Sequence, residues 1–513
     1  MKRNWLPLAL LLLSILPALY YAVTYREMPH LGHFHDDGVY MGSAMRLAEG
    51  KGFVVASVPG EPPQTRFPIL FPLYLAIGFK LGGIMVLIWV LLPIFVLLLW
   101  NWYRCAGLGE WQAAMLCAFM ALNTYTVLFS ISPMSELLAC CLLFGALLAV
   151  EREGLGWIAV AGICSAAAYL TRSALIAVPA GLGIYLLLRR RWIPCLAYAA
   201  ITAPAVLWWN HFVATNANPN AKGAALFYTN YLGFYKENVT LETLPAVIGT
   251  NLIHLIQSLS NVLYFEGGGN PVEFNLARLL ALGAIAGVVK LALSKGLTPY
   301  HLCAAVYAGG LLIWNYVPHE RLVYPLVPLL LAGLSNEVIG FCGMLRQSWT
   351  KQRSAAILIG SIFGLIFIGL VIRDVQGVTS RLSSLLDRHR DFRAEKQKAF
   401  QWIAANTSPQ ATFLAYDEPV LHLNTGRHGY GMHFPSRYFY ADDRKSIVQF
   451  FKDGPKLARA EGVQYILETP YDFEQDLVDT EPAEVRKAWA ADAGLDLVYE
   501  TAQIRIRKVR LPK

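Results

Sequence analysis

The chain has 513 residues, of which 56% are hydrophobic and 15% charged, and its mean hydropathy is +0.42. A soluble protein carries about a quarter charged residues, so the composition excludes an ordinary soluble domain and predicts a membrane protein. The net charge of +8 does not indicate nucleic-acid binding, because Lys and Arg gather at the ends of hydrophobic segments, as in Arg189–Arg191.

The first hydrophobic segment runs from Trp5 to Tyr25 without a charge and is preceded by Lys2 and Arg3. It is longer than the core of a signal peptide, which has about 7–15 residues, and no small-residue cleavage pattern follows. We therefore predict a retained signal anchor whose N-terminus lies in the cytoplasm.

Further apolar segments of about the length that crosses a bilayer recur along the chain. With the first, they predict about eleven spans, the others at 84–103, 110–130, 133–150, 155–171, 173–188, 192–212, 274–294, 297–316, 321–337 and 354–372. The apolar piece 68–79 is too short to cross and predicts an interfacial or re-entrant helix. The segment 244–263 is long enough, but its polar residues favour an interfacial helix; they are Asn251, His254, Gln257, Ser258 and Ser260.

The basic clusters between spans give the orientation. If 68–79 does not cross, the clusters at 189–191, 290–295 and 346–353 all face the cytoplasm, as the positive-inside rule requires. The loops at about 26–83 and 213–273, and the tail from 374, then lie on the outer side.

The tail from 374 to 513 is charged and has no spanning segment. Strand patterns occur at 412–416, 463–468 and 500–509, and helix patterns at 395–405 and 483–493. We predict a polytopic α-helical membrane domain over 1–373 and a small extracytoplasmic α/β domain over 374–513. Within the tail, the aromatic and basic residues 428–438 are either a contact for a glycan or lipid head group or an ordinary loop.

Polar residues that are costly near lipid mark the outer ends of the predicted spans. They are Asp36, Asp37, Arg66, Glu136, Arg172, His319, Glu320 and Arg321. Each has a simple structural explanation: Glu136 can cap a helix, Arg172 can occupy a turn, and 319–321 can form a local ion pair. Together on one side of the membrane, acids and arginines predict a cavity.

Carboxylates, arginines and access to lipid suit the transfer of a sugar from a lipid phosphate. The acceptor hydroxyl needs a general base, which a positioned Asp supplies. The leaving phosphate needs Arg or a metal ion to stabilise its charge. An outer site also explains a lipid-linked donor, since nucleotide sugars are cytoplasmic.

Five motifs occur in an order that matches a known family. They are 36–40 (DDGVY), 66–74 (RFPILFPLY), 135–136 (SE), 170–172 (LTR) and 320–325 (ERLVYP). Over about residues 1–340 the chain resembles the GT-C glycosyltransferases, in the branch of the protein O-mannosyltransferases and the aminoarabinose transferases. The second acid, Asp37, stands where the family more often has Glu.

The resemblance implies roles for the polar residues. Asp36 would be the catalytic base or a metal-site acid, with Asp37 as its partner, and Glu136 would orient the acceptor. The donor phosphate would be bound by Arg66, Arg172, His319 and Arg321. Mg²⁺ or Mn²⁺ could bind at the acidic pair, and a metal-free site built from arginines is equally consistent with the sequence.

The expected partners are a polyprenyl-phosphate sugar, membrane lipids and an extracytoplasmic acceptor, and the expected location is a bacterial plasma membrane. Two other functions stay open. A lipid-linked glycan flippase should show repeated halves and charges at the bilayer midplane, which this sequence lacks. A ligase or polymerase would move whole glycans from a lipid diphosphate.

Overall fold

The chain passes back and forth between two structural units. A computed structural model describes residues 5–264, 271–349, 353–473 and 476–511. The first unit comprises Met1–Arg26, Met85–Leu207 and Gly249–Leu385, and the second comprises Glu27–Ile84, Trp208–Ile248 and Leu386–Lys513. The second unit therefore contains the C-terminal tail together with residues from both predicted outer loops.

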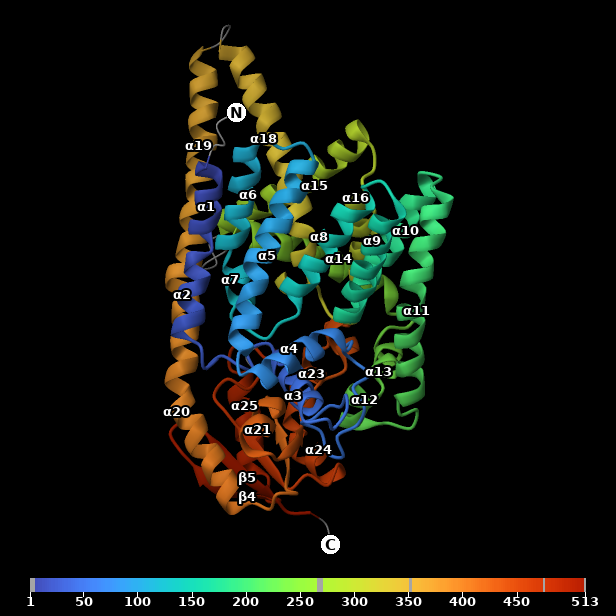
Figure 1. Cartoon of the computed structure of the whole chain (residues 1–513). Helices are drawn as coiled ribbons and strands as arrows, with labels where there is room; N and C mark the ends of the chain where they lie inside the picture. The colour runs from blue at the N-terminus through green and yellow to red at the C-terminus, as the bar shows by residue number, and fades with distance from the viewer. Residues whose placement is uncertain (1–4, 265–270, 350–352, 474–475, 512–513) are drawn as a thin grey trace. The chain divides into compact units, whose positions relative to one another are not determined.

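Apolar helices make up the first unit (Figure 1). They are α1 (Leu6–Ser14), α2 (Leu16–Thr24), α5 (Ile84–Cys105), α6 (Glu110–Leu122), α7 (Thr124–Phe129), α8 (Glu136–Val150), α9 (Leu155–Thr171), η1 (Ser173–Ile176), α10 (Ala177–Leu188), α11 (Trp192–Asn216), α14 (Leu244–Leu263), α15 (Pro271–Lys295), α16 (Pro299–Leu312), α17 (Glu320–Val323), η2 (Tyr324–Leu326), α18 (Val327–Trp349), α19 (Arg353–Gln376) and η3 (Gly377–Leu382). Helices α11, α14 and α5 reach across the boundary between the units.

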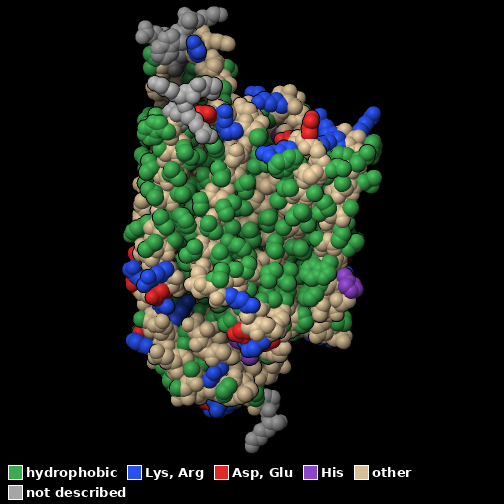
Figure 2. Space-filling model, viewed as in Figure 1, with side chains coloured by type: hydrophobic (Ala, Val, Ile, Leu, Met, Phe, Trp, Pro, Cys, Tyr) green, Lys and Arg blue, Asp and Glu red, His purple; other side chains and the backbone are tan. Residues whose placement is uncertain are grey.

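The chain is a multi-pass membrane protein. In the described residues, six helices are long and apolar enough to cross a bilayer: Leu6–Thr24, Ile84–Cys105, Trp192–Asn216, Leu244–Leu263, Pro271–Lys295 and Glu320–Gln347. Hydrophobic side chains cover much of the visible face, and Lys and Arg side chains lie beyond both ends of the hydrophobic area (Figure 2). Such a belt is the surface that lipid requires.

Each span predicted from the sequence coincides with helical structure. The predicted span 110–130 is broken at Asn123, whose side chain accepts a hydrogen bond from the backbone N–H of Tyr125 and so caps α7. Helices α8, α9 and α10 are shorter than a full crossing. The number of crossings therefore stays a prediction. Of the basic residues used for orientation, Lys2, Arg3 and residues 350–352 lie outside the described part of the chain.

Helix α14 is long and apolar enough to cross, although its polar residues favoured an interfacial position. The structure gives those residues another role. The Asn251 amide donates hydrogen bonds to the carbonyls of Leu311, Leu312 and Trp314, and the Ser258 hydroxyl donates to Pro318. Both side chains are buried, so their polarity serves contacts inside the first unit rather than a water-facing surface.

The second unit is built around a five-stranded sheet. Its elements are α3 (Asp36–Ala48), α4 (Leu70–Leu81), α12 (Gly223–Thr229), α13 (Tyr231–Asn238), α20 (Ser383–Asn406), β1 (Thr412–Ala415), α21 (Glu418–Thr425), β2 (His428–Tyr430), α22 (Ser436–Tyr440), α23 (Arg444–Lys452), α24 (Gly454–Ala460), β3 (Tyr465–Glu468), α25 (Glu481–Ala491), β4 (Leu495–Glu500) and β5 (Arg505–Val509). The strand order is β2-β1-β3-β5-β4, with β1 parallel to β2 and β3, and β5 antiparallel to β3 and β4.

The two faces of this sheet bury separate cores. Phe413 of β1 packs with Phe392 and Ile403 of α20 on one face. The next residue, Leu414, packs with Phe451 and Trp489 of α23 and α25 on the other. This alternation is the period of two expected for a strand covered on both sides. The tail therefore contains a small sheet with helices on both faces, while the domain bounds 374–513 stay a prediction. Helix α4 is a short apolar helix, as predicted for 68–79.

Close glycine packing between α15 and α18 provides a test of the membrane fold. A Cβ atom on Gly287 would lie 2.3 Å from the carbonyl oxygen of Gly333, whereas one on Gly283 would meet nothing within 4 Å. Small residues allow membrane helices to approach this closely. We expect Gly287→Ala to destabilise the protein by about 1–3 kcal/mol through overpacking, seen as a lower Tm in detergent.

The matched control is Gly283→Ala on the same helix. It should leave the Tm unchanged or raise it slightly, since Ala favours a helix more than Gly. Equal Tm values for the two variants would show that α15 and α18 do not pack as described.

Candidate active site

The predicted acidic pair begins helix α3 in the second unit. Asp36 is 6% exposed and Asp37 is fully buried. The residue before them, His35, has a φ of +57° and turns the chain into the helix. Carboxylates in a first helical turn are stabilised by the positive end of the helix dipole, which partly offsets the cost of burying them.

The two oxygens of Asp37 both accept backbone hydrogen bonds. Oδ2 accepts from the N–H of Gly32 at 3.0 Å, and Oδ1 accepts from the N–H of Gly38 at 2.8 Å. Burial, followed by the charge of the nearby Asp417, raises the pKa of Asp37 to about 7. Burial likewise raises the pKa of Asp417 to about 6. At neutral pH Asp37 is therefore partly protonated, whereas Asp417 is mostly ionised.

Arg66 is the partner of Asp36. Its Nη2 lies 3.3 Å from Asp36 Oδ1, and both side chains are largely buried. The guanidinium group also lies over the rings of Phe227 at 4.2 Å, Phe67 at 4.6 Å and Tyr231 at 5.4 Å. Cation–π contacts with three rings hold its plane in place. The sequence predicted both charged residues of this pair.

A buried network extends from His35 into the C-terminal tail. His35 Nε2 lies 3.1 Å from Glu418 Oε2, and the hydroxyl of Tyr228 donates to Glu418 Oε1 at 2.8 Å. That hydroxyl also accepts from the N–H of Gly431 and lies 3.1 Å from Nε2 of His433. Glu418 is fully buried, so these partners supply what water would otherwise provide.

The charges in this network follow from its surroundings. Burial alone lowers the pKa of His35, but the charge and hydrogen bond of Glu418 outweigh it, so the pKa of His35 is raised. Burial, with the charges of His35 and Arg66, holds the pKa of His433 well below its usual value. His433 is therefore neutral. Because the Tyr228 proton already points to Glu418, Nε2 of His433 carries the hydrogen that Tyr228 accepts.

The remaining predicted residues lie in the first unit. Glu136 is the first residue of α8 and is fully buried, and it pairs with Nη1 of Arg172 at the end of α9. Arg172 also donates to the Ser135 hydroxyl at 3.3 Å. An acid at a helix start and a base at a helix end each suit the local dipole. Both structural explanations from the sequence, a cap and a turn, therefore apply here.

The third predicted group begins helix α17. Nε of Arg321 donates to Nε2 of His319 at 3.0 Å, and Glu320 accepts from the Asn261 amide at 2.7 Å. The buried hydroxyl of Tyr307 donates to the carbonyl of Leu322 at 2.8 Å. Arg172 and Arg321 lie in the first unit, while Asp36, Asp37 and Arg66 lie in the second.

Four further residues belong to the group around Asp36 and Arg66: Asp417, Glu418, Tyr228 and His433. The first three have no local signal in the sequence, since each lies about 190 residues or more from Asp36 and no motif spacing links them. His433 falls within 428–438, the stretch considered for glycan or head-group contact. Its place beside Phe227 and Tyr228 shows a packed residue rather than one in a free loop.

Comparisons with known proteins give a structural likeness only. No family model matches the chain, and no curated protein matches it. Two solved structures of ArnT from Cupriavidus metallidurans are similar. The apo state has 13% identity and a TM-score of 0.45, and the state bound to undecaprenyl phosphate has 14% identity and a TM-score of 0.44; each match covers 92% of this chain and 93% of the other.

ArnT is an aminoarabinose transferase, so these structures come from the branch that the sequence motifs resemble. At TM-scores below 0.5, the likeness assigns neither an activity nor site residues to this chain.

The raised pKa of Asp37 predicts a pH dependence of stability. Since its pKa is about 7 in the folded state and about 4 when unfolded, the native state binds the extra proton between these values. Stability is therefore highest at the acidic end and falls as pH rises through 7, by roughly 4 kcal/mol at most. We expect Asp37→Asn to flatten the fall of Tm between pH 4.5 and 7.5.

Asp496→Asn is the control, because the exposed Asp496 pairs with Arg510 and its pKa is lowered. It should keep the wild-type slope. An Asp37→Asn variant whose Tm falls with pH as steeply as the wild type would show that Asp37 is ionised throughout.

Proposed function

We propose that this protein is a membrane glycosyltransferase that moves a sugar from a polyprenyl-phosphate donor to an extracytoplasmic acceptor. In this reaction the acceptor hydroxyl loses its proton to a base, and its oxygen attacks the anomeric carbon. The bond from that carbon to the phosphate oxygen breaks, and the lipid phosphate leaves. The observation that carries the proposal is the buried Asp36–Arg66 pair directly after the first membrane helix.

Asp36 is the better candidate for the general base. Both oxygens of Asp37 are held by the backbone of Gly32 and Gly38, which fits a positioning role at the start of α3. The carboxylate of Asp36 instead faces Arg66. A base beside a phosphate-binding cation is the arrangement that attack next to a leaving phosphate requires.

Arg66 is the candidate for the donor phosphate in the second unit. Its aromatic neighbours fix the plane of the guanidinium group without using its N–H donors. Those donors suit two oxygens of a phosphate at once. The proposal therefore gives Arg66 the task of stabilising the charge that develops on the leaving group.

In the first unit, Arg321, His319 and Arg172 remain candidates for the same phosphate. Arg172 already pairs with Glu136, so a phosphate would share it with that carboxylate. Nε of Arg321 donates to Nε2 of His319, which is an imidazole acceptor rather than a carboxylate and so competes less with a phosphate. We therefore rank Arg321 above Arg172, and keep Glu136 as a residue that holds Arg172 or orients the acceptor.

The acceptor can be a lipid, a glycan or a protein, and the proposed location is the bacterial plasma membrane with the second unit on the outer side. A flippase and an oligosaccharide ligase are the other two candidates. A flippase forms no covalent bond and needs no base, so the acidic residues at the start of α3 favour a transferase over it. A ligase would be expected to rely on arginine-rich long loops rather than on an acidic pair after the first span.

Asp36→Asn should reduce sugar transfer about 100- to 10,000-fold, since it removes the general base and keeps the shape of the side chain. The purified protein in lipid discs is given a panel of labelled polyprenyl-phosphate sugars with membrane-extract acceptors, and product mass is measured. Asp496→Asn, an exposed carboxylate in β4, is the matched control and should transfer normally.

Near-normal transfer by Asp36→Asn would contradict the assigned base. Products carrying whole oligosaccharides from diphosphate donors would indicate a ligase, and sugar flux across vesicles without a new covalent product would indicate a flippase.

The location of the second unit gives a separate prediction. Alkaline phosphatase fused after Lys513 should be active and a green fluorescent protein fused there should be dark, because only the phosphatase matures outside the cytoplasm. A fusion after Arg190, in the predicted cytoplasmic loop, should show the opposite pattern. An inactive phosphatase and a fluorescent green fluorescent protein at Lys513 would place the tail in the cytoplasm. That result would exclude an outer site that includes residues of the tail.

A further inference from the structure

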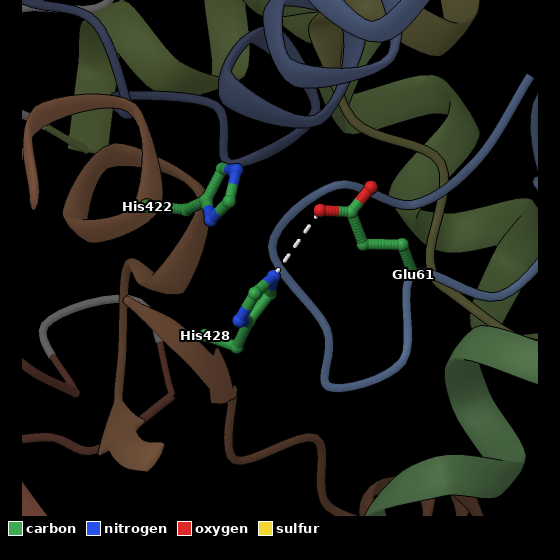
Figure 3. A group of neighbouring side chains, drawn as sticks. All are labelled: Glu61, His422 and His428. Atoms are coloured by element: carbon green, nitrogen blue, oxygen red, sulfur yellow. Dashed lines mark hydrogen bonds and ion pairs between the residues drawn. The ribbon is translucent and has the colours of Figure 1, made fainter. Parts of the chain in front are cut away.

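Three potential metal ligands meet in the second unit, and only His428 belongs to a stretch noted in the sequence. They are Glu61, His422 and His428, whose ligand atoms all lie within 4.8 Å of one another. Figure 3 shows the two imidazole rings and the carboxylate turned toward a shared space. Glu61 comes from the loop after α3, and the two histidines come from α21 and β2 of the tail.

The local fold brings the histidines together. Gly426, with a φ of +70°, ends α21 in the left-handed conformation and turns the chain back into β2. The ring of His428 then lies 4.9 Å from that of His422. The backbone of this strand also anchors the loop of Glu61, because the N–H of Gly429 donates to the carbonyl of Ser57 at 2.7 Å.

His422 is prepared to act as a ligand. Its Nδ1 lies 3.1 Å from the carbonyl oxygen of Arg427, and the side chain is only 3% exposed. A backbone carbonyl accepts a hydrogen bond, so Nδ1 carries the hydrogen and Nε2 keeps its lone pair. Metal-binding histidines are commonly fixed by this outer contact.

One pair of ligand atoms has the spacing found around a bound zinc ion. Zn–N and Zn–O bonds of about 2.0–2.1 Å in a tetrahedron place neighbouring ligand atoms about 3.3 Å apart. Nε2 of His428 lies 3.4 Å from Oε1 of Glu61. The ligand atom of His422 lies within 4.8 Å of both.

An ion-pair network is the competing explanation. Glu61 also pairs with Arg46, which in turn pairs with Glu49. Both Arg46 and His428 contact the Oε1 atom of Glu61. A carboxylate has about four lone pairs on two oxygens, so the arginine and a metal ion can share it. That network accounts for Glu61 as a partner of Arg46 but gives no role to the two imidazoles, because an imidazole carries no negative charge.

We propose that Glu61, His422 and His428 bind a divalent transition-metal ion of the zinc type. Two nitrogens and one oxygen suit Zn²⁺ better than Mg²⁺ or Ca²⁺, which prefer oxygen ligands. The ion ties the loop after α3 to the tail. It also fixes α21, where His422 lies one turn after Glu418 on the same face, and so positions the carboxylate that holds His35.

The test uses full-length protein purified with an affinity tag that contains no histidine. After chelation and dialysis against Zn²⁺, metal analysis should find about one zinc per chain in the wild type. Glu61→Gln and His428→Ala, both at partly exposed positions, should each retain little zinc. His211→Ala, an exposed histidine in α11, is the matched control and should bind zinc as the wild type does.

Measuring the Tm with and without Zn²⁺ distinguishes a variant that has lost zinc binding from one that has failed to fold. Zn²⁺ should raise the Tm of the chelated wild type and of His211→Ala, while Glu61→Gln should unfold at the wild-type metal-free Tm and show no rise with Zn²⁺. With Co²⁺ in place of Zn²⁺, the wild type should show the strong visible absorption of a tetrahedral Co²⁺ site, and Glu61→Gln should not. Zinc content and Tm shifts equal in wild type and Glu61→Gln, or no zinc in either, would overturn the proposal.

Discussion

The second unit depends on the hydrogen bonds that the buried carboxylate of Glu418 makes with His35 and Tyr228. An unpaired carboxylate without water would cost several kcal/mol, and here His35 and Tyr228 provide its partners. His35 immediately precedes Asp36, so the same contact sets where α3 begins. Close packing supports it, because a Cβ on Gly38 would lie 2.8 Å from Pro419. The geometry of Asp36 and Arg66 therefore rests on a residue far away in the tail.

Much of the fold could be predicted because it follows from local sequence. Apolar length located the helices, and alternation located β1, β3 and β5. Strands β2 and β4 were missed: β2 has three residues, and the burial of β4 along the sheet edge is only partial. The internal contacts of Asn251 and Ser258 could not be predicted, since their partners lie some sixty residues further on, and the interfacial position of 244–263 stays a prediction. Local patterns cannot distinguish internal hydrogen bonds from contact with water.

The residues of the candidate site likewise fall into those that local sequence reveals and those that only the folded structure reveals. Asp36, Asp37 and Arg66 were recognisable because charged residues beside a membrane span are unusual by themselves. Glu418 and Tyr228 look ordinary in their own segments and acquire meaning only through contacts with His35 and each other. The pairing of Glu136 with Arg172 was also beyond prediction, because each residue had a sufficient local explanation as a cap or a turn.

The interleaved second unit also limits how the chain can be threaded through a bilayer. A folded polar domain lies on one side, so the chain must leave it and return on the same side each time. Such a return requires an even number of crossings, and the six spans predicted between residues 84 and 212 meet this requirement. Between 249 and 385 the described residues contain α14, α15, α16, the continuous α17–α18 segment and α19. This set is odd, so the predicted topology requires that at least one of these helices does not cross. The interfacial position predicted for 244–263 and the 14-residue length of α16 make α14 and α16 the candidates.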